Sequence, residues 1–224
     1  MNQQQLVSRV LKPAIFVVAL VPLALLVWNA LHDGLGANPV EAITFKTGDW
    51  GLRFLLITLC VTPLRRITGW QWLARIRRLL GLFAFFYICL HFSTYLVLDA
   101  FFDLRYILED ITDRTYITLG FTSFLLLIPL AMTSTNAMVR RLGGQRWRRL
   151  HRLVYLIAAG GTLHFLWLVK ADLREPLIYL GLLLLLLLAR VPAVAERLAK
   201  IRTRSVPPKS DTRSHQPAMN STEV

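Results

Sequence analysis

Apolar residues in this chain gather into long, nearly unbroken runs, and short stretches rich in charge separate one run from the next. Several runs approach the length of about 20 residues that a helix needs to cross a lipid bilayer. The pattern predicts an all-α fold: a polytopic membrane helix bundle with six transmembrane helices. We expect them at residues 13–31, 50–64, 79–101, 115–134, 150–169 and 176–195.

The segments outside these runs divide the chain further. The first run follows Arg9 and Lys12 as a secretory signal would, but it is longer than a signal-peptide core and no small-residue cleavage pattern closes it, so we expect it to be retained. Residues 1–12 are predicted to be a cytoplasmic N-terminus and residues 13–202 one six-helix transmembrane domain. Residues 203–224 are polar and too poor in apolar side chains to form a core, which predicts a disordered cytoplasmic tail.

The formal net charge of +13 would suit a nucleic-acid partner, but the charges are sorted by side once the helices are placed. Most of the 26 basic residues precede the first run, lie between the second and third or fourth and fifth runs, or follow the sixth. Most of the 13 acidic residues fall on the opposite side. Basic loops face the cytoplasm, so both termini are predicted to be cytoplasmic. Topology and anionic lipid explain the basic excess, and no nucleic-acid recognition module is visible.

Three histidines, His91, His151 and His164, lie within or at the mouth of the predicted membrane helices. A histidine in a membrane span typically faces the interior of the bundle and marks a relay, a ligand or a metal. At about 1.5 Å per residue, His91 and His164 lie roughly 18 and 21 Å from the cytoplasmic boundary, so they share one depth on two different helices.

Two imidazoles at one depth can occupy both axial positions of a haem iron, with the porphyrin edge-on between the helices. A hydrogen bond from either histidine to a neighbouring helix is the simpler alternative. A zinc site would need a third or fourth ligand, for which Cys89 is the nearest candidate. Side chains expected to pack on a porphyrin are Leu82, Phe83, Phe86, Leu90, Leu163 and Phe165.

His151 lies about 20 Å from His164 along the same helix and cannot bind the same iron. A second haem at that level would need an axial partner from the third helix, where the sequence has Arg77 and Arg78 instead. These arginines could bind haem propionates, flavin phosphate or lipid phosphate, or could simply mark the cytoplasmic side. His151 itself is a possible second haem ligand, a quinone hydrogen-bond donor or an interfacial side chain.

The same histidines would also suit a small proton channel or transporter that uses them as relays. Against this alternative, the six helices show no evident internal repeat and no acidic residue at mid-depth to couple an ion.

Two segments carry a family resemblance: RRLLGLFAFFYICLHFSTY at residues 77–95 and RWRRLHRLVYLIAAGGTLHFLWLVK at residues 146–170. Over about residues 10–200 the chain resembles the ferric-reductase-like transmembrane domain family, and within it the haem subunits of bacterial periplasmic methionine sulfoxide reductase systems. The interval from His151 to His164 is similar to that on the fifth helix of the family. A second histidine on the third helix would fall at Arg77, which puts a conventional second haem in doubt.

The resemblance implies a multi-pass protein of the bacterial inner membrane that carries haem b and is associated with FMN. It implies electron delivery from the respiratory quinone pool to a separate periplasmic molybdenum-containing reductase, with which it forms a heterodimer and which repairs oxidised methionines. Electrons would enter near His151, Arg77 and Arg78 and reach a haem on His91 and His164. The chain would be an electron-transfer subunit, with sulfoxide reduction on the partner. No glycine-rich dinucleotide motif is present to hold the flavin.

Overall fold

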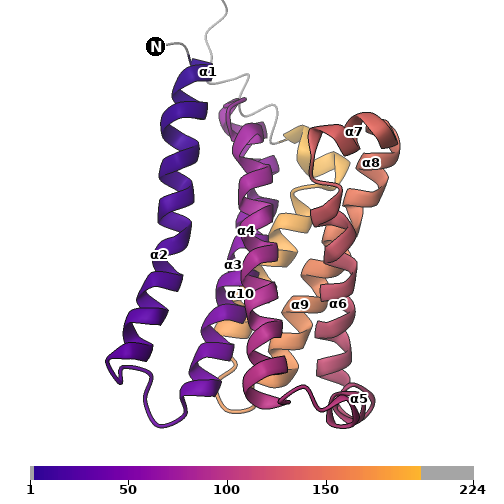
Figure 1. Ribbon diagram of the computed structural model, residues 1–224. Helices are drawn as coiled ribbons and strands as arrows, with labels where there is room; N and C mark the ends of the chain where they lie inside the picture. The colour runs from indigo at the N-terminus through magenta and orange to yellow at the C-terminus, as the bar shows by residue number, and fades with distance from the viewer. Residues whose placement is uncertain (1–2, 198–224) are drawn as a thin grey trace, which may run out of the picture.

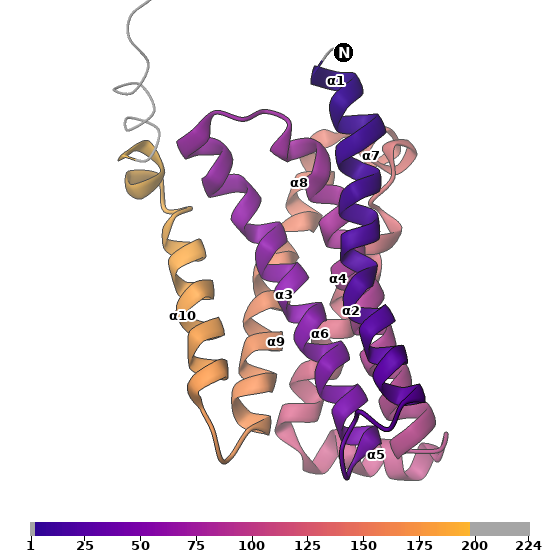
Figure 2. The same cartoon turned by 90° about the vertical axis from the view of Figure 1, so that its left-hand side faces the viewer.

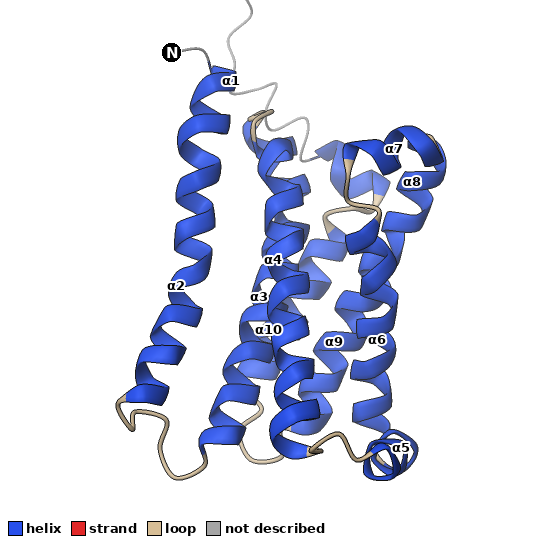
Figure 3. Cartoon of the chain, viewed as in Figure 1, coloured by secondary structure: helices blue, strands red, loops and turns tan. Residues whose placement is uncertain are grey.

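Six long helices, running up and down side by side, dominate the part of the chain that the computed structural model describes, residues 3–197 (Figure 1). They are α2 (Lys12–Leu31), α3 (Pro39–Thr68), α4 (Leu73–Thr94), α6 (Thr115–Met132), α9 (Val154–Leu168) and α10 (Arg174–Leu188). No β-strand occurs within residues 3–197 (Figure 3), which confirms the predicted all-α class. The predicted tail, residues 203–224, and the end of the predicted domain lie outside the described residues.

Short helices lie at both ends of the bundle. The N-terminal helix α1 (Gln3–Leu6) and the C-terminal end of α10 lie at the same end, together with α7 (Asn136–Leu142) and α8 (Gly144–Leu150) (Figures 1 and 2). We call this the terminal end. Helix α5 (Leu104–Asp113) lies across the opposite end, which we call the α5 end.

Helix α3 is longer than the 15-residue run predicted for it, because its first turns contain polar residues that hide it from hydropathy. It begins at Pro39, where the Asn38 side chain accepts a hydrogen bond from the Glu41 N–H at 3.3 Å. It ends at Thr68, and the next residue, Gly69, has a φ of +75° that favours glycine and donates its N–H to the Arg65 carbonyl.

The helix at the α5 end was not predicted from the sequence. The Asp103 carboxylate caps it by accepting from the N–H groups of Arg105 and Tyr106. Its inner side includes the buried Asp110, whereas Leu104 and Leu108 on its outer side are exposed. Helix α4 approaches it through a π-helical segment, Tyr95–Asp99, so the two helices together bring polar groups over the end of the bundle.

Three helical segments are long and apolar enough to cross a membrane: Val7–Leu31, Leu73–Asp99 and Thr115–Met132. Helices α9 and α10 have 15 residues each, a length of about 22 Å at 1.5 Å per residue. The outward faces of α2 and α10 are apolar and unpartnered; Val18 and Leu185, for example, are 67% and 65% exposed. Such continuous apolar faces require an apolar environment.

The core of the bundle lies between α3, α4 and α9, where Leu59, Ala84 and Ile157 are almost completely buried. Tyr87 of α4 fastens α2 to this core. Its hydroxyl donates to the Ala19 carbonyl at 2.7 Å and accepts from the Leu23 N–H at 3.2 Å, two groups that pair with each other in a regular helix.

Candidate functional site

The structure brings together the two histidines that the sequence placed at one depth. His91 projects from α4 and His164 from α9, with ring centroids 6.1 Å apart and ring planes inclined by 76°. Among residues 3–197, no group of three or more His, Cys, Asp or Glu side chains is arranged to hold a metal ion. The pair is therefore suited to a cofactor that supplies its own equatorial ligands.

A backbone carbonyl of the adjacent helix holds each ring. Nδ1 of His91 lies 2.9 Å from the Thr44 oxygen in α3, and Nδ1 of His164 lies 2.7 Å from the Tyr116 oxygen in α6. A carbonyl oxygen can only accept, so each Nδ1 carries the proton and donates it. In a neutral imidazole this leaves the Nε2 lone pair free, which is the arrangement of a metal-binding histidine with its outer hydrogen bond in place.

A glycine under each ring makes these contacts possible. A methyl group added at Gly48 would lie 2.9 Å from Nδ1 of His91, and one added at Gly120 would lie 2.7 Å from Nδ1 of His164. Each glycine stands four residues after the residue whose carbonyl accepts from the histidine. The α3–α4 and α6–α9 pairs thus seat their histidines in the same way.

The separation of the rings suits a single metal ion between them. An imidazole nitrogen binds a metal at about 2.0 Å and lies about 1.1 Å from its ring centroid, so two imidazoles on opposite sides of one ion have centroids about 6.2 Å apart. The observed 6.1 Å matches this value. His91 and His164 would thus hold a haem between α4 and α9.

A largely apolar cavity of about 260 Å³ surrounds the two histidines. Five phenylalanines line it: Phe45, Phe92, Phe121, Phe124 and Phe165. Of the side chains that the sequence suggested for porphyrin packing, only Phe165 is among the lining residues, while Phe83 instead packs against Phe16 and Phe54. The apolar helices could not reveal which face turns inward, because lipid and cavity favour the same residues.

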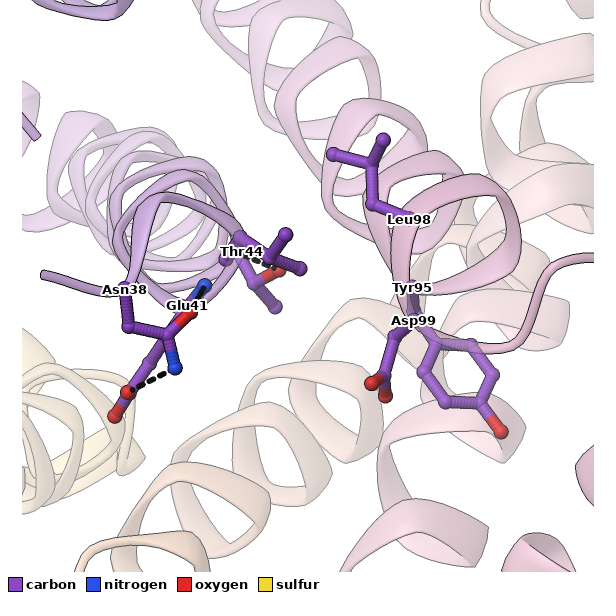
Figure 4. A pocket seen from close by; sticks show the side chains of 7 residues that line it. Asn38, Glu41, Thr44, Tyr95, Leu98 and Asp99 are labelled. Atoms are coloured by element: carbon purple, nitrogen blue, oxygen red, sulfur yellow. Dashed lines mark hydrogen bonds between the residues drawn. The ribbon is translucent and has the colours of Figure 1, made fainter. Parts of the chain in front are cut away.

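At the α5 end the cavity adjoins a second, more open hollow of about 360 Å³. Figure 4 shows Asn38, at the start of α3, with Glu41 and Thr44 on one side of this hollow and Leu98 and Asp99 on the other. Thr44, Tyr95 and Asp99 line both spaces. The site of the two histidines is therefore closest to polar surroundings at the α5 end.

A buried carboxylate and an arginine meet at this end of the cavity. Asp110 of α5 pairs with Arg114 at 3.2 Å and accepts a hydrogen bond from the Tyr95 hydroxyl at 3.2 Å. Burial alone would lower the pKa of the Arg114 guanidinium, but Asp110 and the nearby Tyr116 raise it above its ordinary value. Both members of the pair line the cavity.

A second charged group lies beside the cavity between α3 and α10. Arg53 binds the Asp49 carboxylate at 2.8 Å, and both side chains contact the Tyr179 hydroxyl, which donates to Asp49 and accepts from Arg53. The Tyr179 hydroxyl and both oxygens of the Asp49 carboxylate thus have partners, which limits the cost of placing them in an apolar bundle. The network ties α10 to α3 at the site, and only Asp49 reaches the cavity.

Comparison with known proteins bears directly on this site. Residues 47–162 match the family model described as "Ferric reductase like transmembrane component". A protein of Herminiimonas arsenicoxydans named "Protein-methionine-sulfoxide reductase heme-binding subunit MsrQ" is 56% identical over 183 residues, which cover 81% of this chain and 84% of the relative. The MsrQ protein of Rhodospirillum rubrum is 56% identical, over 82% of this chain and 89% of the relative. That of Xanthomonas oryzae pv. oryzae is 48% identical, over 91% of this chain and 96% of the relative. The chain belongs to the MsrQ family.

Membership of the MsrQ family confirms the resemblance predicted from the two histidine-containing segments, and it makes the bundle a ferric-reductase-like transmembrane domain. The names of these MsrQ relatives describe heme-binding subunits. The residues present fit such a group: two imidazoles with ring centroids 6.1 Å apart and Nδ1 already engaged, two glycines that admit the rings, and an apolar cavity.

The third histidine is held differently. Nε2 of His151 lies 3.1 Å from the Thr133 hydroxyl, which already donates to the Pro129 carbonyl at 2.6 Å and so accepts from His151. The ring of His151 stacks on Trp147 with centroids 3.9 Å apart. His151 therefore lies at the terminal end with Nε2 engaged, and only Nδ1 remains for another partner.

The two arginines that the sequence grouped with His151 diverge in the structure. Arg77 is half-buried and close enough to His151, Tyr155 and Arg190 to interact with them electrostatically. Arg78 is exposed and donates to the Asn136 side chain of α7. Arg77 is thus part of a cluster of positive charge with Arg65 and Arg190 at the terminal end, and Arg78 contacts the loop helices.

Sequence reasoning found the two histidines but missed the residues that seat them and the arginine at the cavity. Thr44, Gly48, Tyr116 and Gly120 act through backbone atoms or the lack of a side chain, so side-chain chemistry gave no sign of them. Glycine within an apolar helix is a usable signal, because it often marks a close approach of another group. In the sequence, Arg114 is distinguished only as one of the few basic residues on the side opposite the predicted cytoplasmic loops.

Proposed function

We propose that this protein is a haem b-containing electron-transfer subunit that passes electrons across the membrane, from the respiratory quinone pool to the periplasmic molybdenum-containing reductase MsrP. Its partner would carry out the reduction of oxidised methionines in proteins. The observation that carries this proposal is the His91–His164 pair, with both Nε2 atoms free and a separation that suits one iron. The names of the MsrQ relatives support it independently.

Different residues of the chain would orient the haem ligands, make room for them and keep water away from the cofactor. Thr44 and Tyr116 orient the two imidazoles through their carbonyl groups, and Gly48 and Gly120 admit the rings. The phenylalanines of the cavity exclude water, which favours electron transfer over side reactions. Bound between two histidines, a haem supplies a one-electron carrier with no open position for oxygen.

The membrane arrangement follows from length and charge. Both described ends of the chain lie at the terminal end, where the arginine-rich segments α7 and α8 also lie. By the positive-inside rule this end is cytoplasmic, and the α5 end is periplasmic. We propose six spans within a domain of residues 13–202, a cytoplasmic N-terminus at 1–12, a cytoplasmic tail at 203–224, and residence in the bacterial inner membrane.

The terminal end is where we propose that electrons enter. His151 and Arg77 lie near each other there, within a cluster of positive charge that suits an anionic group. FMN phosphate, a quinone or the propionates of a second haem would meet these residues, with Arg78 at the rim. His151 would act through Nδ1, whose lone pair could accept a hydrogen bond from a quinol hydroxyl or bind the iron of that second haem.

The α5 end is where we propose that electrons leave for MsrP in a heterodimer. Carboxylates are frequent on this surface, with Glu41 and Asp99 at the open hollow and Glu109 and Asp113 on α5. A proton channel built on the same histidines is less well supported, because each ring donates to a backbone carbonyl rather than to the next group of a relay.

A reconstitution experiment tests the function. The purified protein in proteoliposomes is expected to show a split Soret band and a sharp α band when dithionite reduces it, and to transfer electrons from an added quinol to MsrP with an oxidised methionine peptide as acceptor. Methionine formed per quinol consumed is the measurement. A colourless, folded protein would contradict the haem, and a haem protein that quinol reduces but MsrP never oxidises would contradict the partner.

Replacing His151 by alanine is expected to slow quinol-driven reduction at least tenfold while haem on His91 and His164 is retained, because the two sites lie at different depths. Stopped-flow reduction by quinol, beside haem content per protein, is the measurement. Thr133→Val, which removes the hydroxyl that accepts from His151, is the matched variant and should slow entry less. Quinol reduction at the wild-type rate in His151→Ala would rule out this entry site.

A further inference from the structure

The cavity of the two histidines has a polar end and an apolar end. Its lining toward the terminal end consists of deeper residues of each helix, such as Leu55, Ile157 and Phe124. Toward the α5 end the lining includes Tyr95, Asp110 and Arg114. A haem carries its two carboxylates on one edge, and burying them among apolar groups would be costly. If the proposed function is correct, that edge must therefore face the α5 end.

Within the described residues, Arg114 is the only lysine or arginine that lines this cavity. It precedes α6 and stands just before Tyr116, whose carbonyl accepts from His164, so its backbone lies within one helical turn of the level of the axial ligands. A guanidinium offers a planar fork of donors that matches a carboxylate. The remaining charged groups of the lining, Asp49, Asp99 and Asp110, are all acidic.

The other opening at this end is unsuitable for a carboxylate. Glu41 and Asp99 both line the hollow between α3 and the π-helical segment (Figure 4). Two negative groups would repel a propionate there. On the α5 side, by contrast, the Asp110 carboxylate already holds Arg114 at the cavity, and Tyr95 in turn holds Asp110.

We infer that Arg114 is the counter-ion of a haem propionate at the α5 end of the cavity, and that Asp110 is the residue that positions it. The inference rests on the proposed haem site and adds its orientation: the propionate edge faces the side from which electrons leave. It also moves the propionate contact away from Arg77 and Arg78, neither of which lines this cavity.

Haem loss measures the contact directly. Transfer of haem from the purified protein to excess apomyoglobin is expected to be about tenfold faster in Arg114→Gln than in the wild type, since a charge-assisted hydrogen bond would be lost. Arg114→Lys should lie between the two, because it keeps the charge without the fork. The midpoint potential of Arg114→Gln is expected to fall, since a positive charge near the iron favours the reduced form. Arg105→Gln removes an exposed arginine of α5 that pairs with Glu109, and it should behave as the wild type.

Haem dimethyl ester, in which both carboxylates are blocked, separates a direct contact from a structural role. With this ligand the wild type and Arg114→Gln should lose haem at the same rate, whereas a general loosening of the cavity would keep the variant faster. If Arg114→Gln does not fold because Asp110 is left unpaired, Asp110→Asn/Arg114→Gln removes both charges and takes its place.

Three results would overturn the inference, and a fourth would overturn the proposed function. Equal haem loss by the wild type and Arg114→Gln with unmodified haem would overturn the inference, and so would a tenfold effect of Arg77→Gln in its place. A difference that persists with the ester would assign Arg114 a structural role and also overturn it. A wild-type protein without haem would instead overturn the proposed function, so the two failures are distinguishable.

Discussion

Replacing either His91 or His164 by alanine is expected to lower haem content at least tenfold and to remove the sharp α band of the reduced protein. In the proposed site each histidine would supply one Nε2 to the same iron, and no other histidine of the described residues lines the cavity to replace it. Loss of an axial ligand should cost more than the 10–100-fold typical of losing an outer hydrogen-bond partner. Pyridine haemochrome analysis per mole of purified protein is the measurement.

His32→Ala provides a matched control. His32 also directs Nδ1 toward a carbonyl oxygen, that of Trp28 at 2.9 Å, but it is exposed and stacks on the Trp28 ring away from the cavity. In His164→Gly, added imidazole should restore part of the α band, because the Tyr116 carbonyl would still orient the free ligand. Wild-type haem stoichiometry in both His91→Ala and His164→Ala would show that the ligand assignment is wrong.

Gly48→Ala and Gly120→Ala are expected to reduce haem binding severely although neither glycine touches the iron. The added methyl group would meet the ring of His91 at 2.9 Å or that of His164 at 2.7 Å, distances that real structures essentially never show. The ring must move, and its hydrogen bond to the carbonyl four residues earlier must lengthen or break. Since loss of such a partner typically costs 10–100-fold in affinity, we expect at least a tenfold loss, and a larger one at Gly120.

Gly181→Ala separates this effect from the general cost of changing a helical glycine. A methyl group at Gly181 of α10 would meet nothing within 4 Å, so this variant should keep its haem and gain about 0.5–1 kcal/mol of stability from the better helix former. Haem content and the thermal unfolding of haem-depleted protein are measured for all three variants. If Gly120→Ala kept haem at the wild-type level, the close approach of Gly120 to the His164 ring would not matter for haem binding.

The sequence was most informative where one strong physical demand acted on many residues. Burying whole helices in lipid requires long apolar runs, and these runs predicted the helical class. They also placed both ends of α2 and of α6 within two residues of the observed ends. It was less informative where polar residues continued a helix. The start of α3 at Pro39 and the amphipathic helix α5 were missed, because capping and an apolar stripe, rather than mean hydropathy, define them.

His91 and His164 show what the sequence by itself determined: two imidazoles at one depth, on helices whose rise is fixed at about 1.5 Å per residue. Only the tertiary structure decided that Thr44 and Tyr116 orient them, that Gly48 and Gly120 make room, and that Arg114 rather than Arg77 lines the cavity. Depth depends on distance along one helix and can be read from spacing. Contacts between helices depend on how each helix is rotated and packed, and in an almost uniformly apolar helix the spacing of residues does not encode that rotation.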